Sequence, residues 1–218
     1  MKLLPAIEIE TKDNPDTSII WLHGLGADGN DFAPIIPELR LPESMAVRFI
    51  FPHAPQIPVT VNEGYVMPAW YDILEMEIDR KVDTEGLLAS ANEINGFIEN
   101  ELERGIDSRR IIVIGFSQGG AVAYQVALSH AKPLGGLLAM SCYFATSASI
   151  QLNEANKDLS LEIHHGTYDP VVPESLGKNA AEQLKNHGYI VNFRSYPMEH
   201  GVCPQQIEDI SKWLQQLL

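Results

Sequence analysis

The chain has 218 residues, of which 45% are hydrophobic, and this is enough to bury one sizeable core. Its formal net charge of −14 would repel phosphate backbones and anionic lipid headgroups, so we expect no nucleic-acid partner. No apolar run is long enough for a transmembrane helix, and the acidic N-terminal residues do not fit a signal peptide. The only cysteines, Cys142 and Cys203, indicate free thiols in a reducing cytoplasm. We therefore expect one cytoplasmic domain over residues 1–218.

Short apolar runs alternate with longer segments of helical period along the chain. This order is typical of a parallel sheet with helices on both faces. Several runs are apolar without alternation, as expected of strands buried on both faces. A weaker run at 6–9 indicates an edge strand. The other predicted strands are 18–22, 47–51, 111–114, 136–140, 161–164 and 191–196.

Four helices are predicted from the 3.6-residue period of apolar side chains. The first begins after Asp83 or Thr84, either of which can cap it, and Gly105 ends it. The helices run over about 84–104, from Ser117 to about 129, over 174–187, and from Pro204 onward. The inward positions are Leu87, Leu88, Ala91, Ile94, Ile98 and Leu102 in the first, Leu176, Ala180 and Leu184 in the third, and Ile207, Ile210, Leu214 and Leu217 in the last.

The stretch from Pro52 to about Val82 shows no sustained period and contains four prolines. A loop of this length in a compact domain is usually functional or disordered. Trp70 and Tyr71 within it favour an ordered segment that covers part of the molecule. We call residues 52–82 the covering loop.

The segment Gly115-Phe116-Ser117-Gln118-Gly119 lies between the predicted strand 111–114 and a helix. A strand-to-helix turn this tight needs small residues beside the serine, and it presents the hydroxyl at a helix N-terminus, which favours developing negative charge. The pattern predicts Ser117 as the nucleophile of an α/β-hydrolase fold. The alternative is a tight turn with a capping serine.

A serine hydroxyl needs a base, and in this fold an acid and then a histidine follow the serine in the chain. His200 follows the last predicted strand and Asp169 follows the one before it, so both are expected at the same sheet edge as Ser117. Asp169 would orient the ring of His200. An Asp-Pro turn is the alternative for Asp169, and Glu199 is the rival acid.

Acyl transfer also needs backbone amides that face the developing oxyanion. The amide of Gln118, directly after the nucleophile, is one candidate. The glycine-rich loop after strand 18–22 supplies the second, and Leu25 is the expected donor. This loop has neither a phosphate-binding Gly-Lys-Ser/Thr nor a dinucleotide pattern.

These motifs, in this order, resemble the phospholipase/carboxylesterase family, which includes bacterial carboxylesterases and acyl-protein thioesterases. The resemblance covers the chain from about residue 18 to its end. The sequence differs from the family at Ala27, Asn30 and Pro68, and none of these is a candidate catalytic residue. The matching segments are 23–26 with 28–29, 58–60, 69–73, 115–120, 165–166 with 169–173, and His200 with 202–204.

The resemblance implies an α/β-hydrolase fold, a mostly parallel sheet with helices on both faces, and hydrolysis without metal or cofactor. It implies a Ser117, Asp169 and His200 triad acting on short-to-medium acyl esters, with lysophospholipids or acylated proteins as alternative substrates. Dimers occur in the family. The expected substrate-binding residues are Trp70 and Ile73 in the pocket floor and Val171 and Val172 near the rim. A non-catalytic binding module is the competing interpretation.

Overall fold

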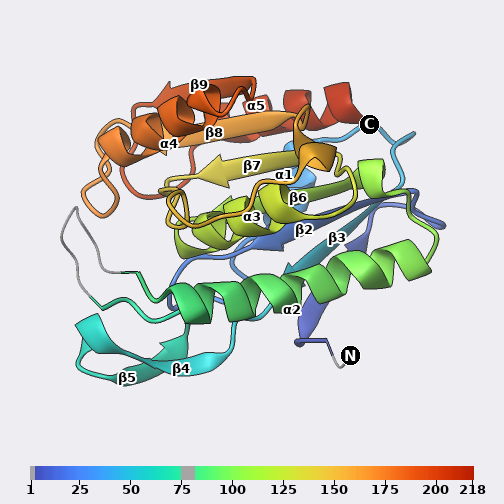
Figure 1. Cartoon of the computed structure of the whole chain (residues 1–218). Coiled ribbons are helices and arrows are strands. Elements are labelled where there is room, and N and C mark those ends of the chain that lie inside the picture. Colours follow the sequence, from blue (N-terminus) through green and yellow to red (C-terminus); the bar gives the residue numbers. More distant parts are fainter. Residues whose placement is uncertain (1–2, 75–81) are drawn as a thin grey trace.

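The computed structural model describes residues 3–74 and 82–218, and its centre is a seven-stranded sheet (Figure 1). The strand order is β1-β3-β2-β6-β7-β8-β9, and every neighbouring pair is parallel except β1 with β3. The predicted parallel sheet with an added edge strand is confirmed. The strands are β1 (Ala6–Glu10), β2 (Thr17–Leu22), β3 (Val47–Pro52), β6 (Ile111–Phe116), β7 (Gly136–Met140), β8 (Leu161–Gly166) and β9 (Val191–Tyr196).

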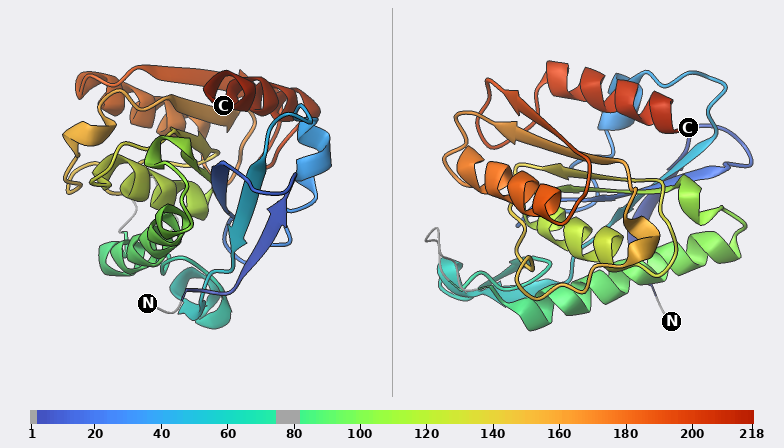
Figure 2. Two further views of the ribbon diagram at one scale, coloured as in Figure 1. Left: turned by 90° about the vertical axis from the view of Figure 1, so that its right-hand side faces the viewer. Right: turned by 45° about the horizontal axis from the view of Figure 1, so that its top comes forward.

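Helices cover both faces of this sheet because the central strands are apolar on both sides. Among the described residues, three helices pack on one face and two on the other. Figure 2 shows helices on both sides of the sheet. The first group is α2 (Thr84–Glu103), α3 (Gln118–Ser129) and α4 (Glu174–Asn186), and the second is α1 (Ile35–Leu39) and α5 (Pro204–Leu217). Single 3-10 turns lie at Thr60–Asn62, Ser108–Arg110 and Glu154–Asn156.

The helix ends follow the sequence signals. Asp83 caps α2 by accepting a hydrogen bond from the amide of Gly86 at 3.0 Å, and Gly105 follows the helix at a φ of +92°. Pro204 occupies the first turn of α5. One detail of the prediction was wrong: Leu88 is 45% exposed rather than inward.

The covering loop contains regular structure that its prolines concealed. Two short strands, β4 (Gln56–Val59) and β5 (Tyr65–Pro68), form an antiparallel hairpin. Each of these strands contains a proline. Because proline has no backbone N–H to donate to a neighbouring strand, its presence argues against a strand when only the sequence is read. Figure 1 shows the hairpin on the side toward which β7 and β9 point. Residues 75–81 of the covering loop lie outside the described residues.

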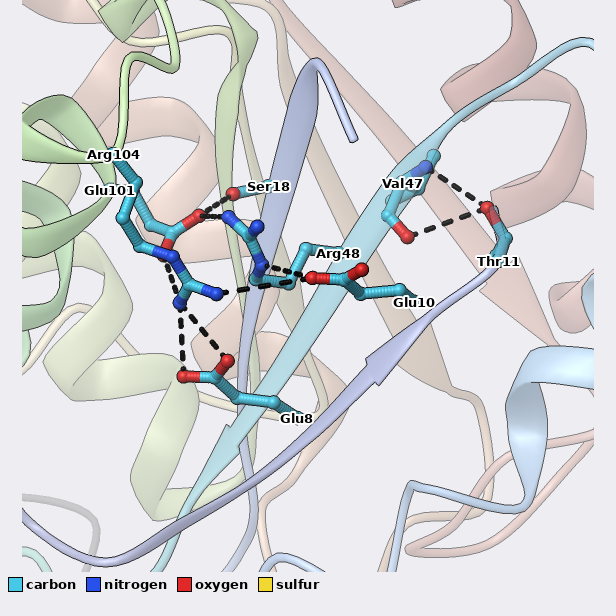
Figure 3. A network of polar contacts seen from close by, with 8 residues as sticks. All are labelled: Glu8, Glu10, Thr11, Ser18, Val47, Arg48, Glu101 and Arg104. Atoms are coloured by element: carbon cyan, nitrogen blue, oxygen red, sulfur yellow. Dashed lines mark hydrogen bonds and ion pairs between the residues drawn. The ribbon is translucent and has the colours of Figure 1, made fainter. Parts of the chain in front are cut away.

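A buried network of charges ties α2 to the start of the sheet (Figure 3). The fully buried Glu101 carboxylate accepts from Arg48 Nη1 at 2.6 Å, from Arg104 Nη1 at 2.9 Å, and from the Ser18 hydroxyl. Arg48 Nε also donates to Glu10 at 2.9 Å. Ser18 and Arg48 lie near the beginnings of β2 and β3, so the network occupies the N-terminal edge of the parallel strands.

Candidate active site

Ser117 lies in the turn between β6 and α3, with φ 54° and ψ −120°. A positive φ is strained for a serine, and such strain persists only where the surroundings enforce it. Two glycines allow the turn: a Cβ on Gly115 would lie 2.3 Å from the Gly119 carbonyl oxygen, and one on Gly119 would lie 2.5 Å from the His23 carbonyl oxygen. The close approach of these backbones therefore fixes the position of the Ser117 hydroxyl.

The two residues predicted as base and acid meet Ser117 at the C-terminal edge of the sheet. His200 Nε2 lies 2.9 Å from Ser117 Oγ, and His200 Nδ1 lies 2.7 Å from Asp169 Oδ2. Asp169 follows β8 and His200 follows β9. The His200 ring also packs on Phe116, with ring centroids 4.8 Å apart. In this geometry the Ser117 hydroxyl is hydrogen-bonded to one nitrogen of the His200 ring, and the other ring nitrogen is hydrogen-bonded to the Asp169 carboxylate. This is the arrangement of a nucleophile, a base and an orienting acid.

The backbone holds Asp169 in this orientation. Its Oδ1 accepts hydrogen bonds from the amides of Val171 at 2.9 Å and Val172 at 2.8 Å, and its carboxylate is fully buried. His165 lies beneath, with Nε2 donating to the Val172 carbonyl at 2.8 Å. Burial lowers the pKa of His165, which keeps it neutral. Glu199, the rival acid, is exposed.

Leu25 and Gln118 line the same cavity as Ser117. Among the residues that the structure describes, neither backbone amide donates to a protein acceptor. The loop that carries Leu25 is hydrogen-bonded to the covering loop, because the amide of Gly26 donates to the Pro68 carbonyl at 2.8 Å. The covering loop therefore supports the backbone that presents Leu25.

The side chain of Gln118 joins the serine turn to the covering loop. Its Oε1 accepts from the Trp70 amide at 2.8 Å, and its Nε2 donates to the Tyr71 carbonyl at 2.6 Å. The Trp70 indole N–H donates to the His23 carbonyl at 2.8 Å. Three segments far apart in sequence are thus hydrogen-bonded around the turn.

A cavity of about 310 Å³ opens beside the Ser117 hydroxyl. Ile73, Val171 and Val172 line it, but Trp70 does not. The predicted place of Trp70 in the pocket floor is therefore wrong, because its ring is buried against His23. The remaining lining residues are Gly24, Leu25, Ala27, Asp31, Tyr71, Phe116, Ser117, Gln118, Tyr143 and His200.

Sequence reasoning missed several of these lining residues. Tyr143 follows the end of β7, and this position at the C-terminal sheet edge was a signal that could have identified it. Its hydroxyl lies 3.3 Å from that of Tyr71. Asp31 and Ala27 had no such signal, because the path of the loop after β2 decides which of its side chains reach the cavity.

Two further features of residues 3–74 and 82–218 concern metals and membranes. No group of three or more His, Cys, Asp or Glu side chains there could hold a metal ion. None of the helices in these ranges has the length and apolar character needed to cross a lipid bilayer.

The fold and the residues around Ser117 define a class, and comparisons with known proteins agree: the chain is a serine hydrolase with the α/β-hydrolase fold. Residues 5–218 match the model of the phospholipase/carboxylesterase family, and the chain belongs to this family. Acyl-protein thioesterase 1 of Gibberella zeae is 37% identical over 92% of this chain and 90% of its own length. The Neurospora crassa protein of that name is 35% identical, over 99% and 91%.

A solved structure extends the likeness to three dimensions. SOBER1 of Arabidopsis thaliana superimposes with a TM-score of 0.86 at 29% identity, over 92% of this chain and 98% of that chain. The architecture is therefore that of its relatives throughout the aligned residues.

Proposed function

We propose that this chain is a carboxylesterase that hydrolyses short-to-medium acyl esters through an acyl-enzyme on Ser117. The observation that carries the proposal is the hydrogen-bonded series Ser117, His200 and Asp169, of which Ser117 and His200 line the 310 Å³ cavity. Apolar side chains on its walls, Ile73 and Val172 among them, suit an acyl chain.

In the proposed first step, His200 Nε2 takes the Ser117 proton while Ser117 Oγ attacks the carbonyl carbon. Asp169 holds the ring in the tautomer that leaves Nε2 free to accept, and stabilises the imidazolium that forms. The amides of Leu25 and Gln118 receive the oxyanion. The leaving group departs with the proton from His200, and a water activated by His200 then releases the acid.

A second candidate is the hydrolysis of thioesters on acylated proteins, which the two named relatives favour. The same nucleophile and oxyanion donors serve an ester or a thioester, because both pass through a tetrahedral intermediate. Lysophospholipid hydrolysis stays an alternative of the same machinery. A cytoplasmic location and a homodimer stay predictions.

The test has two parts. A fluorophosphonate probe should label the wild-type chain and should not label Ser117→Ala, whereas Ser175→Ala, which alters an exposed serine in α4, should be labelled normally. Values of kcat/KM should then be measured for 4-nitrophenyl esters from acetyl to dodecanoyl and for thioesters of matched acyl length. The proposal fails if Ser117→Ala keeps most of the activity on 4-nitrophenyl butyrate.

A further inference from the structure

A second cavity, of about 300 Å³, also borders His200. It shares Asp31, Phe116 and His200 with the first cavity, so the two meet at the imidazole. Leu25 and Gln118 line only the first. The other residues that line the second cavity are Phe32, Ile35, Gly201 and Val202.

This arrangement separates the two halves of a substrate. The carbonyl oxygen must face the amides of Leu25 and Gln118, which places the acyl half at the first cavity. The leaving atom instead faces His200 Nε2, which donates a proton to it as it departs; an alkoxide in particular is a poor leaving group without that proton. The second cavity is bordered by His200 and by neither amide donor, so it is positioned to receive the leaving half.

Asp31 gives the second cavity its charge. Among the residues that the structure describes, Asp31 is the only Asp or Glu in the lining, and no hydrogen bond or ion pair between these residues engages its carboxylate. The walls beside it include Phe32 and Phe116, whose ring centroids lie 5.6 Å apart. A free carboxylate beside aromatic faces attracts cations. The net charge of −14 acts in the same direction.

We propose that the second cavity binds the leaving group and that Asp31 selects leaving groups carrying a positive charge near the scissile bond, such as an acylated cysteine flanked by basic residues. This rests on the proposed function. When the tetrahedral intermediate collapses, the bond from the carbonyl carbon to the leaving sulfur or oxygen breaks, and its electron pair goes to the leaving atom. That atom takes the proton from His200 Nε2, and the neutral thiol or alcohol leaves through the second cavity.

A lysophosphatidylcholine is a poorer fit, although it too carries a cation. Its phosphate lies between the ester and the choline, so the anion would face Asp31 first. When the Asp31 charge is removed, we therefore expect kcat/KM to fall for the cationic peptide and to rise for the lipid.

The charge is tested with butyrylthiocholine and its uncharged isostere, S-(3,3-dimethylbutyl) thiobutyrate. We expect the wild-type chain to favour the cationic substrate in kcat/KM by about threefold, the size typical of an exposed ion pair. Asp31→Asn should abolish this ratio, and added salt should reduce it in the wild type. Asp28→Asn is the matched control: Asp28 lies in the same loop, lines neither cavity, and its amide analogue keeps the acceptor used by Asn30.

A ratio that is equal in the wild type and in Asp31→Asn would overturn the inference. The proposed function would still stand if both substrates were hydrolysed and Ser117 were labelled. S-butyryl cysteine peptides with a neighbouring lysine, compared with lysophosphatidylcholine, separate the two sources of cation. If Asp31→Asn lowered kcat/KM more for lysophosphatidylcholine than for the peptide, the assignment to a peptide would be overturned.

The division between cavities is tested by filling each one from its rim. Val202 is 40% exposed in the second cavity and Val171 is 43% exposed in the first. Val202→Trp should lower kcat/KM roughly tenfold more for a bulky leaving group than for an ethyl ester, whereas Val171→Trp should discriminate by acyl length. The same pattern in both variants would contradict the assignment of separate cavities.

Discussion

Two buried clusters of charge lie at opposite edges of the same parallel sheet. At the N-terminal edge, Glu101 is surrounded by two arginines and a serine hydroxyl (Figure 3). At the C-terminal edge, Asp169 is surrounded by two backbone amides and His200. Both carboxylates are fully buried. The two clusters differ in what their partners can do.

The partners of Glu101 keep their protons, because an arginine is always charged in proteins. That cluster stabilises the junction between α2 and the edge of the sheet. Asp169 instead faces an imidazole, the side chain whose proton moves most readily near neutral pH. That imidazole also borders two cavities. Burial of a carboxylate alone therefore says little about function; the titratability and access of its partner decide it.

The largest expected effect comes from Asp169→Asn. The amide still offers an oxygen to the amides of Val171 and Val172, but its NH₂ group favours the wrong tautomer of His200. We expect kcat to fall about 10⁴-fold with little change in thermal unfolding. Steady-state kinetics and circular dichroism melting measure the two quantities. Asp158→Asn, an exposed site, is the control. A kcat within tenfold of the wild type would contradict the role proposed for Asp169.

The same isosteric change at the opposite edge should do the reverse. Glu101→Gln leaves Arg48 buried with only Glu10 as a carboxylate partner, and a broken buried pair costs about 3–5 kcal/mol of unfolding free energy. We expect kcat/KM to remain near the wild-type value below the unfolding transition. Urea denaturation measures the stability, with the exposed Glu103→Gln on the same helix as control. If Glu101→Gln lost as much activity as Asp169→Asn, the proposed difference in role between the two carboxylates would be contradicted.

A third prediction concerns pH. Burial lowers the pKa values of His23, His164 and His165, so the folded chain holds these rings neutral. As pH falls below about 6.5, the unfolded chain takes up protons that the folded chain refuses. The stabilisation is therefore complete above that pH and is lost as pH falls toward the lowered folded pKa values. Each ring contributes a slope of up to about 1.4 kcal/mol per pH unit.

Urea denaturation at pH 7.5, 6.5, 5.5 and 5.0 gives this slope. His164→Gln should make it shallower, because one of the three rings whose pKa is lowered by burial is gone. His187→Gln removes an imidazole from an exposed position and serves as the matched control. An identical slope in the wild type and His164→Gln would show that His164 does not contribute.

The contrast between the edges also separates what the sequence could and could not predict. Ser117, Asp169 and His200 each follow a recognisable strand, and parallel strands bring their C-terminal ends to one edge. Glu101 and Ser18 are 83 residues apart and carry no motif, so their contact depends on how α2 packs. Asp31 reaches both cavities for the same kind of reason, since the path of a loop decides it.

The covering loop shows the limit most directly. Its aromatic residues predicted order, and the hairpin β4–β5 provides it, but a proline in each short strand argues against a strand when only the sequence is read. Trp70 was predicted in the pocket floor because an apolar lining suits an acyl chain. A buried indole also needs an acceptor for its N–H, and the His23 carbonyl supplies it.

The smallest expected effect tests that corrected position. Trp70→Phe removes the indole donor at 2.8 Å from the His23 carbonyl, two residues before Leu25, and keeps most of the apolar ring. If Trp70 supports the glycine loop, the Leu25 amide loses alignment and kcat falls about tenfold while KM stays near its wild-type value, because the amide acts mainly on the transition state. If instead Trp70 formed the pocket floor, KM would change and the change would grow with acyl length. Measuring kcat and KM separately on 4-nitrophenyl acetate and octanoate distinguishes the two, and an effect confined to the KM for octanoate would contradict the supporting role.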